Sequence, residues 1–569
     1  MSDHSLSRRR VIQGAAAVGA LAWVEAHRIP AASAALPTPP GFPAGIPLFQ
    51  QAYTNWARDI AVAGVWTCTP ATPADVVTLA NWARSKGWRL RPKGSSHNWS
   101  PLTLAADGSD APNVVLVDTR TNLKAVSVDT ATSRVRAQAG ITMEALLTAL
   151  EAQGLGLTAT PAPGDLTLGG VLAIDGHGTA VPRTGEVKPA GHTYGSVSNL
   201  VQEVTAVVWD TATSSYVLRT FARSHADAGA LMAHVGRAFV TEVVLQTGAN
   251  QRLRCQSWFN IPATELFAPA GSSGRTVQSY LNSAGRMEAI WFPYTPNPWL
   301  KVWSVAPSKP LLSRQVNAPY NYTFSDNLPQ SFFDLAGAIV SGNPGGTPDF
   351  GLTNYNIVAA GLVTTLTYDI WGWSKNLLLY VRPSTLRVTA NGYAILCKRA
   401  DVQRVINEFT TRYRTRLAAY QASGKFPMNG PVEIRVTGLD HPGDIGATRS
   451  PQLSALRPRP DRTDWDCAVW LDILTLPGTP YADDFYTEIE SWVLSNYASY
   501  AAVRPEWSKG WGYTAAGAWT SSAVVDTAVP AAYRAGQPST DRWDTAIATL
   551  DRLDPHRVFT SDFVDRLLS

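Results

Sequence analysis

Alternating and helical hydrophobic patterns follow one another through the first part of the chain. Apolar residues recur at helical spacing over residues 73–88 and 141–157, which predicts a helix in each range. Alternating or β-branched runs bounded by turn residues predict strands, at residues 89–92, 113–119, 133–140, 201–210, 214–221 and 238–247. This mixture of helices and strands is typical of an α+β unit that extends to about residue 250.

The pattern changes character from residue 251 onward. Aromatic-rich strands are predicted there, at residues 288–305, 385–400, 431–440 and 467–476. They alternate with long amphipathic helices, at residues 401–423 and 481–500, and a last helix is predicted around residues 542–553. Because a chain of 569 residues is too long for one hydrophobic core, we place a second domain after residue 250.

The first 34 residues have the features of an export peptide. Residues 7–12 (SRRRVI) resemble a twin-arginine signal, residues 11–24 are modestly apolar, and the small residues Ala32–Ala34 follow. The apolar stretch is shorter than the ~20 residues of a membrane span, so we expect a cleaved signal and a secreted protein. The alternative is a disordered tail with adjacent arginines. The proline-rich residues 37–47 then predict a stiff linker.

Composition excludes several classes of partner and site. The net charge of +4 and the absence of a Lys/Arg run after the signal argue against nucleic acid as a partner. The four cysteines are widely spaced, so we expect no zinc or other metal site and predict free, mostly buried thiols. The 20 tryptophans are compatible with a large apolar cavity, although many unrelated proteins share this trait.

Several catalytic motifs are absent, and two glycine-rich loops remain. The chain has no GxSxG, HExxH or GxxxxGK[ST] motif. Residues 176–181 (GHGTAV) begin like a dinucleotide fingerprint, but Val181 occupies the place of its third glycine. The loops at residues 93–99 and 161–178 are rich in glycine and small residues, which lets successive backbone N–H groups point at one pyrophosphate. Residues 194–208 predict a third wall of this site.

These loops, together with later motifs, resemble a known family. RPKGSSHNWSP, PGDLTLGG…GHG, YGSVSNLVQEVTAVVW and the terminal DPHRVF resemble the vanillyl-alcohol-oxidase family of flavoproteins. The later motifs are similar to those of the bacterial cholesterol oxidases of the covalent-flavin type, namely EAIWFPYT, YNYTFSDNLP, IWGWSKN, NGPVEIR, RPRPD, RPEWSKGW and DPHRVFT. The resemblance implies a two-domain α+β architecture: an FAD-binding domain at 35–250, a substrate-binding domain at 251–514, and a segment at 515–569 that returns to the FAD domain.

The resemblance also implies a covalent flavin. The matching position for the link to the 8α-methyl of FAD is His97, whereas a loop histidine without a role is the alternative. Since residues 161–178 contain no cysteine, we expect a single covalent bond. His192 lies in a flavin-contact stretch, and we expect it, like His177, to be structural. The other residues expected at the cofactor are Pro92, Lys93, Gly94, Ser95, Ser96, Asn98, Trp99, Pro163, Gly164, Leu168, Gly169, Gly170, Gly176, His177, Gly178, Gly195 and Ser196.

Five further residues match catalytic positions of the resembled family. Glu433 and Arg435 alternate on one predicted strand and so share a face, although a surface strand can carry such a pair by chance. The resemblance implies that Glu433 is the base and that Arg435 steadies it and the developing oxyanion. Glu288 matches a carboxylate that gates the route of oxygen, and Lys509 matches a cation near the flavin, with a solvated lysine as its alternative. Asp472 stands where we expect an asparagine.

The implied activity is oxidation of the 3β-hydroxyl of cholesterol-like sterols, with O₂ reduced to H₂O₂ and the Δ5 double bond shifted to Δ4. One alternative is the same scaffold acting on a sugar alcohol or lactone, and another is a non-catalytic protein that binds apolar ligands. Aromatic residues expected in the wall favour the sterol, namely Trp291, Phe292, Trp299 and Trp303. A sterol substrate is compatible with transient contact between the protein and a membrane surface during sterol uptake. The sequence indicates no oligomeric state.

Overall fold

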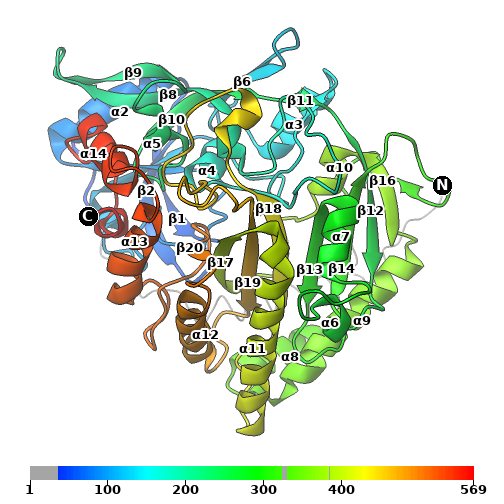
Figure 1. Ribbon diagram of the computed structural model, residues 1–569. Helices are drawn as coiled ribbons and strands as arrows, with labels where there is room; N and C mark the ends of the chain where they lie inside the picture. The colour runs from blue at the N-terminus through cyan, green and yellow to red at the C-terminus, as the bar shows by residue number, and fades with distance from the viewer. Residues whose placement is uncertain (1–35, 323–329, 384) are drawn as a thin grey trace, which may run out of the picture.

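A computed structural model describes residues 36–322, 330–383 and 385–569 (Figure 1). The signal predicted for residues 1–34 lies outside the described residues and stays a prediction. Within the described ranges, every helix is too short or too polar to cross a bilayer. The proline-rich segment after residue 36 packs on the protein, because the indole of Trp66 donates to the Pro37 carbonyl and that of Trp82 to the Pro40 carbonyl.

Two sheets form the first half of the described chain. The four-stranded sheet has the order β1-β2-β4-β3 and consists of β1 (Leu48–Thr54), β2 (Ala61–Cys68), β4 (Val114–Asp118) and β3 (Arg89–Lys93). The five-stranded sheet has the order β5-β6-β10-β8-β9 and consists of β5 (Val126–Asp129), β6 (Arg134–Gln138), β10 (Phe239–Gln246), β8 (Val201–Asp210) and β9 (Ser215–Ala222). A short pair joins β7 (Leu155–Gly156) and β11 (Gly248–Ala249).

The helices of this half begin and end where the sequence supplies caps. Helix α2 (Pro73–Lys86) begins with a capping box between Thr72 and Asp75. It ends at Gly87, whose φ of 69° is the left-handed conformation that glycine adopts without strain. The remaining helices of this half are α3 (Met143–Glu151), α4 (Leu168–Ala173) and α5 (Ala228–Met232). The predicted helix at 73–88 is therefore confirmed to within two residues.

The second half is built on a nine-stranded sheet with the order β15-β16-β12-β14-β13-β18-β19-β17-β20. Its strands are β15 (Arg314–Gln315), β16 (Asp369–Trp373), β12 (Arg252–Trp258), β14 (Trp299–Val305), β13 (Arg286–Trp291), β18 (Val432–Gly438), β19 (Cys467–Thr475), β17 (Thr389–Cys397) and β20 (Ala502–Pro505). The range 288–305, predicted as one strand region, forms the two antiparallel strands β13 and β14. The sequence reasoning missed several strands, among them β1, β2, β5, β12, β15, β16 and β20.

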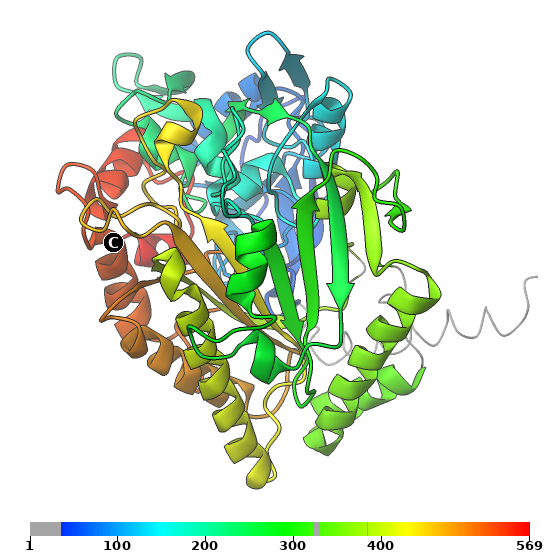
Figure 2. The same ribbon diagram turned by 45° about the vertical axis from the view of Figure 1, so that its right-hand side comes forward.

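Helices pack on both faces of this sheet, and the sheet lies beside the first half of the chain (Figures 1 and 2). On β18, Val432, Ile434 and Val436 pack into the core shared with the helices. By the alternation of a strand, the side chains between them face the other way. The helices on this core are α6 (Ala263–Leu266), α7 (Val277–Ala284), α11 (Val402–Ala422) and α12 (Ala482–Asn496). On the opposite face, α9 (Thr347–Thr364) and α10 (Ser374–Leu378) pack against Trp299 and Trp303, and α8 (Gln330–Val340) packs on α9.

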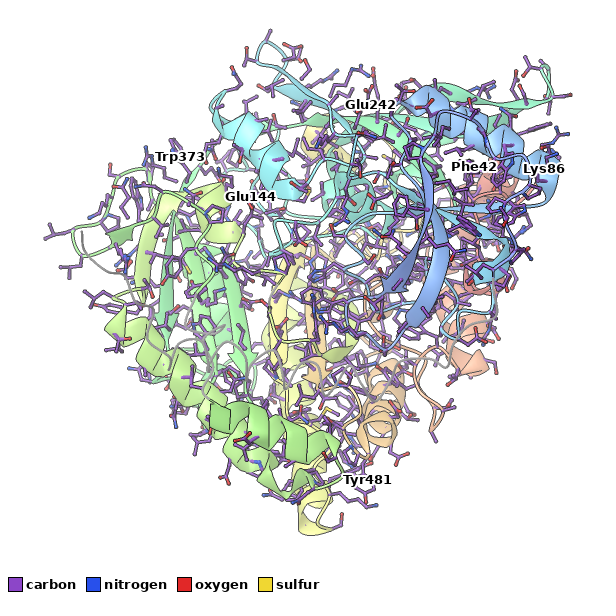
Figure 3. The ribbon with its side chains drawn as sticks, turned by 180° about the vertical axis from the view of Figure 1, so that it is seen from behind. Phe42, Lys86, Glu144, Glu242, Trp373 and Tyr481 are labelled. Atoms are coloured by element: carbon purple, nitrogen blue, oxygen red, sulfur yellow. The ribbon has the colours of Figure 1, made fainter. Side chains whose placement is uncertain are left out.

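The two halves are tied together at several points. Lys375 of α10 lies 3.6 Å from Glu151 of α3, on the side of the molecule where Figure 3 labels Glu144 and Trp373. The C-terminal segment carries α13 (Val529–Arg534), α14 (Trp543–Leu553) and α15 (Asp562–Leu567). It returns to the first half, since Leu90 of β3 donates its backbone N–H to the Val558 carbonyl at 2.8 Å. The domain boundaries at 250/251 and 514/515 stay predictions.

Candidate active site

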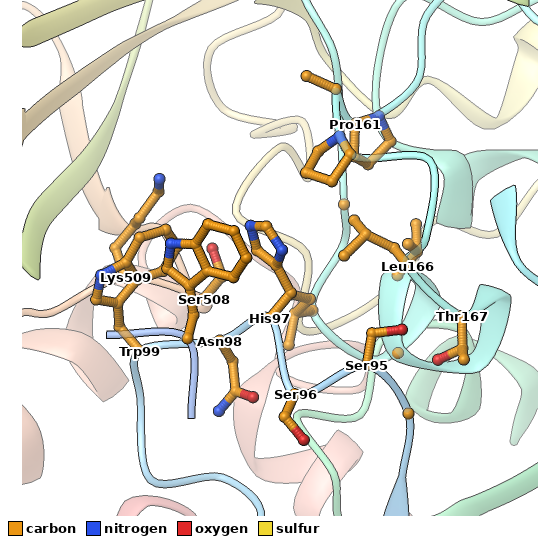
Figure 4. A pocket seen from close by; sticks show the side chains of 18 of the residues that line it. Ser95, Ser96, His97, Asn98, Trp99, Pro161, Leu166, Thr167, Ser508 and Lys509 are labelled. Carbon is orange, nitrogen blue, oxygen red and sulfur yellow. The ribbon is translucent and has the colours of Figure 1, made fainter. Parts of the chain in front are cut away.

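The loop after β3 turns sharply and presents His97. Ser96 has a φ of 54°, a conformation that is unfavourable for a non-glycine residue and is typical of functional loops. A Cβ on Gly94 would lie 2.2 Å from Oγ1 of Thr167, so only glycine lets the two glycine-rich loops approach this closely. Ser95 fastens the contact by donating to the Asp165 carbonyl at 2.5 Å. Figure 4 shows the imidazole pointing from this loop into the space between Lys509 and Pro161.

A cavity of about 400 Å³ begins at this loop and extends to the nine-stranded sheet. This volume lies in the range of small-molecule and cofactor sites. The predicted residues that line the cavity are Pro92, Lys93, Gly94, Ser95, Ser96, His97, Asn98, Trp99, Pro163, Gly169, Gly170, Gly176, His177, Glu288, Trp299, Glu433, Arg435 and Lys509. Within the described ranges no cluster of His, Cys, Asp and Glu has the composition of a metal site.

His97 belongs to a three-layer stack. Its ring lies on the indole of Trp56, with centroids 3.6 Å apart and planes at 22°. The guanidinium of Arg387 lies 3.5 Å above the same indole. Burial, with the nearby charges of Lys509 and Arg387, lowers the pKa of His97 well below its usual value. The imidazole is therefore neutral, and its buried Nδ1 has no hydrogen-bond partner in the protein.

Glu433 and Arg435 face this cavity from β18. The register places Arg435 opposite Glu288 of β13 and Glu433 opposite Asp472 of β19. The Nη1 of Arg435 lies 3.8 Å from Oε2 of Glu433 and 4.0 Å from Oε1 of Glu288, between the two carboxylates. Its Nη2 donates to Asp472. The guanidinium of Arg435 is therefore shared by three carboxylates.

The pKa values of two of these acids, Glu433 and Asp472, are shifted upward. Burial raises the pKa of Glu433, with Arg435 opposing and Glu288 adding to the rise. Burial and the neighbouring Glu506 raise the pKa of Asp472 to about 7, against the attraction of Lys509. A carboxyl with a raised pKa is suited to proton transfer near neutral pH.

A loop after β20 closes the site and carries Lys509. The backbone N–H of Trp99 donates to the Ser508 carbonyl at 2.7 Å, which fixes this loop against the His97 loop. The Nζ of Lys509 lies 4.1 Å from the centre of the Trp99 ring and 3.9 Å from Oδ2 of Asp472. Lys509 is buried, so the solvated alternative does not apply.

His177 and His192 have different surroundings. His177 lines the cavity, stacks on Trp470 at 3.7 Å, and places Nε2 3.9 Å from Oε1 of Glu506. Burial, with Arg435 nearby, lowers its pKa to about 3, so the ring is neutral. His192 lies away from the cavity lining, and its Nε2 lies 3.0 Å from the Ala249 carbonyl.

Five residues expected at the cofactor lie outside the lining of this cavity, namely Gly164, Leu168, Gly178, Gly195 and Ser196. They shape the loops instead. Leu168 is fully buried in the core, and Ser196 donates its hydroxyl and its backbone N–H to the buried Asp440. Contact of these five with the cofactor stays a prediction. Trp291, expected in the aromatic wall, packs on the opposite face of the sheet against Phe267 and Tyr413.

The sequence reasoning missed the lining residues Trp56, Lys301, Tyr380 and Glu506, and it missed Arg387, which stacks on Trp56. Two of them carry a signal in the sequence. Lys301 is a lone charge in the aromatic run WLKVW, and Glu506 precedes Lys509 in RPEWSK. Trp56 and Arg387, which stack with His97, lie more than 300 residues apart in the sequence. No local pattern reveals that they meet.

The four cysteines, Cys68, Cys255, Cys397 and Cys467, are free and buried, as the sequence predicted.

Comparisons with known proteins support this organisation. A family model described as "Cholesterol oxidase, substrate-binding" matches residues 252–569, and one described as an FAD binding domain matches residues 66–212. A solved solvent-stable cholesterol oxidase is 60% identical with a TM-score of 0.92, covering 94% of this chain and 100% of its own. The cholesterol oxidase from B. sterolicum is 47% identical with the same TM-score and coverage. The predicted two-domain α+β fold is thereby confirmed.

Curated relatives match a much shorter stretch. The mitochondrial L-galactono-1,4-lactone dehydrogenases of Brassica oleracea and Arabidopsis thaliana are 32% and 30% identical over 126 residues, 22% of this chain. The chain spans 20% of the length of these relatives. This likeness covers too little of either chain to bear on the substrate.

Proposed function

The chain belongs to the cholesterol oxidase family, as its motifs indicated, and from this premise we propose that it oxidises the 3β-hydroxyl of cholesterol-like sterols. FAD is the cofactor, and O₂ is the final electron acceptor, which yields H₂O₂. One observation carries the proposal: Glu433 and Arg435 face the same cavity as His97. An acid–guanidinium pair and an unpartnered imidazole thus meet in one space.

FAD supplies the two-electron acceptor of the reaction. The residues present fit this group, because the glycine-rich loops leave room for a close backbone approach and Nδ1 of His97 has no partner in the protein. We propose that His97 carries the single covalent link through a ring nitrogen. Lys509 provides a buried positive charge in the lining of the cavity, where it would offset negative charge on the bound group.

Glu433 is proposed to accept the proton of the sterol hydroxyl. Its carboxylate is accessible from the cavity and lies 3.8 Å from Nη1 of Arg435, which steadies the ionised form. Arg435 also stabilises the oxyanion that develops as the proton leaves. After oxidation, Glu433 releases the hydroxyl proton, which the formation of H₂O₂ consumes, and is a carboxylate again. The ketone acidifies the neighbouring C4–H, and Glu433 then moves that proton from C4 to C6, which shifts the double bond from Δ5 to Δ4.

The sterol nucleus is proposed to lie against the apolar part of the cavity, formed by Ile290, Trp299 and Leu386. A polyol would find few hydrogen-bonding groups there. Because sterols partition into membranes rather than water, transient contact with a membrane surface is part of the proposal. Export by the twin-arginine route is supported by the sequence of residues 7–34.

A side-by-side assay of the purified protein with cholesterol and sorbitol tests this function. We expect H₂O₂ and the conjugated 4-en-3-one from cholesterol only. Peroxide from sorbitol would favour the polyol alternative, and a protein without flavin would favour the non-catalytic one. Peptide mapping reports separately whether the flavin is attached at His97, because tight but unattached flavin would refute only the covalent link.

A further inference from the structure

A ladder of alternating charge crosses three neighbouring strands next to the proposed site. The register places Lys301 of β14 opposite Glu288 of β13, and Glu288 opposite Arg435 of β18. All three residues line the cavity, so their side chains share one face of the sheet. Opposite charges that face each other on adjacent strands stabilise one another. The sequence motifs singled out Glu288 and Arg435 but left Lys301 without a role.

The ammonium of Lys301 lies in an aromatic cage. Its Nζ is 3.0 Å from the ring centre of Tyr380 and 4.8–5.2 Å from those of three other rings, Trp303, Tyr322 and Trp299. The Lys301 side chain has no exposed surface. A cage of this kind binds a cation, but it supplies no counter-charge.

Glu288 supplies that counter-charge. Its Oε2 lies 3.3 Å from Nζ of Lys301 and accepts a hydrogen bond of 2.8 Å from the Tyr380 hydroxyl. Its Oε1 faces Arg435 at 4.0 Å without a hydrogen bond. The stronger contacts of the carboxylate therefore point toward β14, away from the guanidinium.

We propose that Lys301 is a positioning residue that holds the carboxylate of Glu288 toward β14 and thereby leaves Arg435 available to Glu433 and Asp472. The inference rests on the proposed function, since Glu433 is its proton acceptor. Burial lowers the pKa of Lys301, while the nearby charge of Glu288 opposes the shift. A buried ion pair is destabilised when one partner is removed, because the other charge remains without compensation. Without Lys301, the nearest cation to Glu288 is Arg435.

The charged and titratable groups around Glu433 lie on its own strand, on the neighbouring strands and on two loops. They are Arg435 on its own strand, Glu288 on β13, Lys301 on β14, Asp472 on β19, Tyr380 after α10, and Glu506 and Lys509 after β20. Movement of Arg435 toward Glu288 removes attraction from the ionised form of Glu433. Ionisation of Glu433 then requires a higher pH.

The test compares Lys301→Met with the double variant Glu288→Gln/Lys301→Met. In the single variant, we expect the acid limb of the kcat/KM–pH profile to move about one unit upward, an approximately tenfold loss below the limb with little change above it. In the double variant, which has no unpaired carboxylate, we expect the limb to return. Lys398→Met, which removes a half-exposed lysine paired with Asp464, is the matched control and should leave the profile unchanged.

Thermal unfolding of the same variants gives a readout that needs no turnover. The two single substitutions, Lys301→Met and Glu288→Gln, should each lower the melting temperature, and the double variant should lower it by less than their sum. A folded Lys301→Met protein with the wild-type pH profile would overturn the proposal, as would additive melting shifts. Absence of sterol turnover in the wild type would instead refute the proposed function and leave the unfolding test of the pair in force.

Discussion

Two buried arginines in the two halves of the molecule are satisfied in opposite ways. Arg91, in the FAD-binding half, donates to four carbonyl oxygens, those of Leu102, Thr103, Gly236 and Phe559. Arg435, in the substrate half, is surrounded by the carboxylates of Glu288, Glu433 and Asp472. Burial lowers the pKa of Arg91 to about 10. Burial acts on Arg435 in the same direction, but the carboxylates outweigh it and raise its pKa well above the usual value.

The partners of Arg91 suit a structural role, whereas those of Arg435 suit a role in proton transfer. Carbonyl oxygens do not titrate and are fixed by the backbone, so the Arg91 contacts hold the C-terminal segment against β3 at any physiological pH. Carboxylates gain and lose protons, and a guanidinium among several of them can change partners. Arg223 follows the pattern of the first half, because its guanidinium donates to the backbone carbonyls of Asn199, Val201 and Arg449. We therefore expect substitutions in the two settings to differ in kind.

Glu433→Gln should have the largest effect on activity. Removal of the proton acceptor is expected to lower kcat by about 10²- to 10⁴-fold, while the folded protein and its flavin remain, since Arg435 keeps two other carboxylates. Steady-state kinetics and the flavin absorbance check this outcome. Glu203→Gln, on the surface of the five-stranded sheet, is the control. A near-normal rate in Glu433→Gln would place the base elsewhere.

The two arginines themselves give the direct contrast. Arg91→Met leaves four carbonyls without a donor and should lower the free energy of unfolding by about 3–5 kcal/mol, with the same loss at pH 5 and pH 8. Arg435→Met should destabilise the fold at pH 8 but much less at pH 5, because the carboxylates with raised pKa values take up protons there. Denaturant unfolding at both pH values measures the difference. Equal pH dependence in the two variants would contradict the distinction between the carbonyl partners of Arg91 and the titrating partners of Arg435.

Asp472→Asn sharpens the contrast within the substrate half. The pKa of Asp472 is raised to about 7, so between about pH 4 and pH 7 the folded state binds more protons than the unfolded state, and stability falls as the pH rises. The asparagine variant should lose this contribution, which amounts to a slope of at most about 1.4 kcal/mol per pH unit. Unfolding measured across this window checks the sign. A slope unchanged from that of the wild type would mean that Asp472 is already ionised at low pH.

Local patterns predicted the elements that carry the site. The alternation of Glu433 and Arg435 placed both side chains on one face, and the glycine content of the two loops predicted that both belong to one site, whose cavity they line. These outcomes depend on backbone geometry within a few residues, which the sequence specifies directly.

Strand register and long-range stacking could not be predicted in the same way. Lys301 gains its partner only because β14 pairs with β13 in one register, and a shift by one residue would turn its side chain to the opposite face of the sheet. The stack on His97 joins Trp56 and Arg387 from opposite halves of the molecule. Contacts of this kind follow from the packing of the whole chain.

Arg387 is bound neither mainly by carbonyl oxygens nor by carboxylates, and its substitution should have the smallest effect of those considered. One Nη donates to the Pro383 carbonyl, and the guanidinium otherwise lies on the Trp56 indole, so its cationic face is satisfied by a ring instead of an acid. Arg387→Met keeps apolar packing on Trp56 but removes a charge that helps to keep His97 neutral. Cation–π contacts of this type contribute about 0.5–1 kcal/mol, which corresponds to a two- to fivefold slower attachment of flavin to His97. The fraction of flavin that remains with the acid-precipitated protein over time measures this rate. Since the charge acts through the protonation state of the imidazole, the deficit should be greatest at low pH, and a deficit independent of pH would assign Arg387 to packing alone.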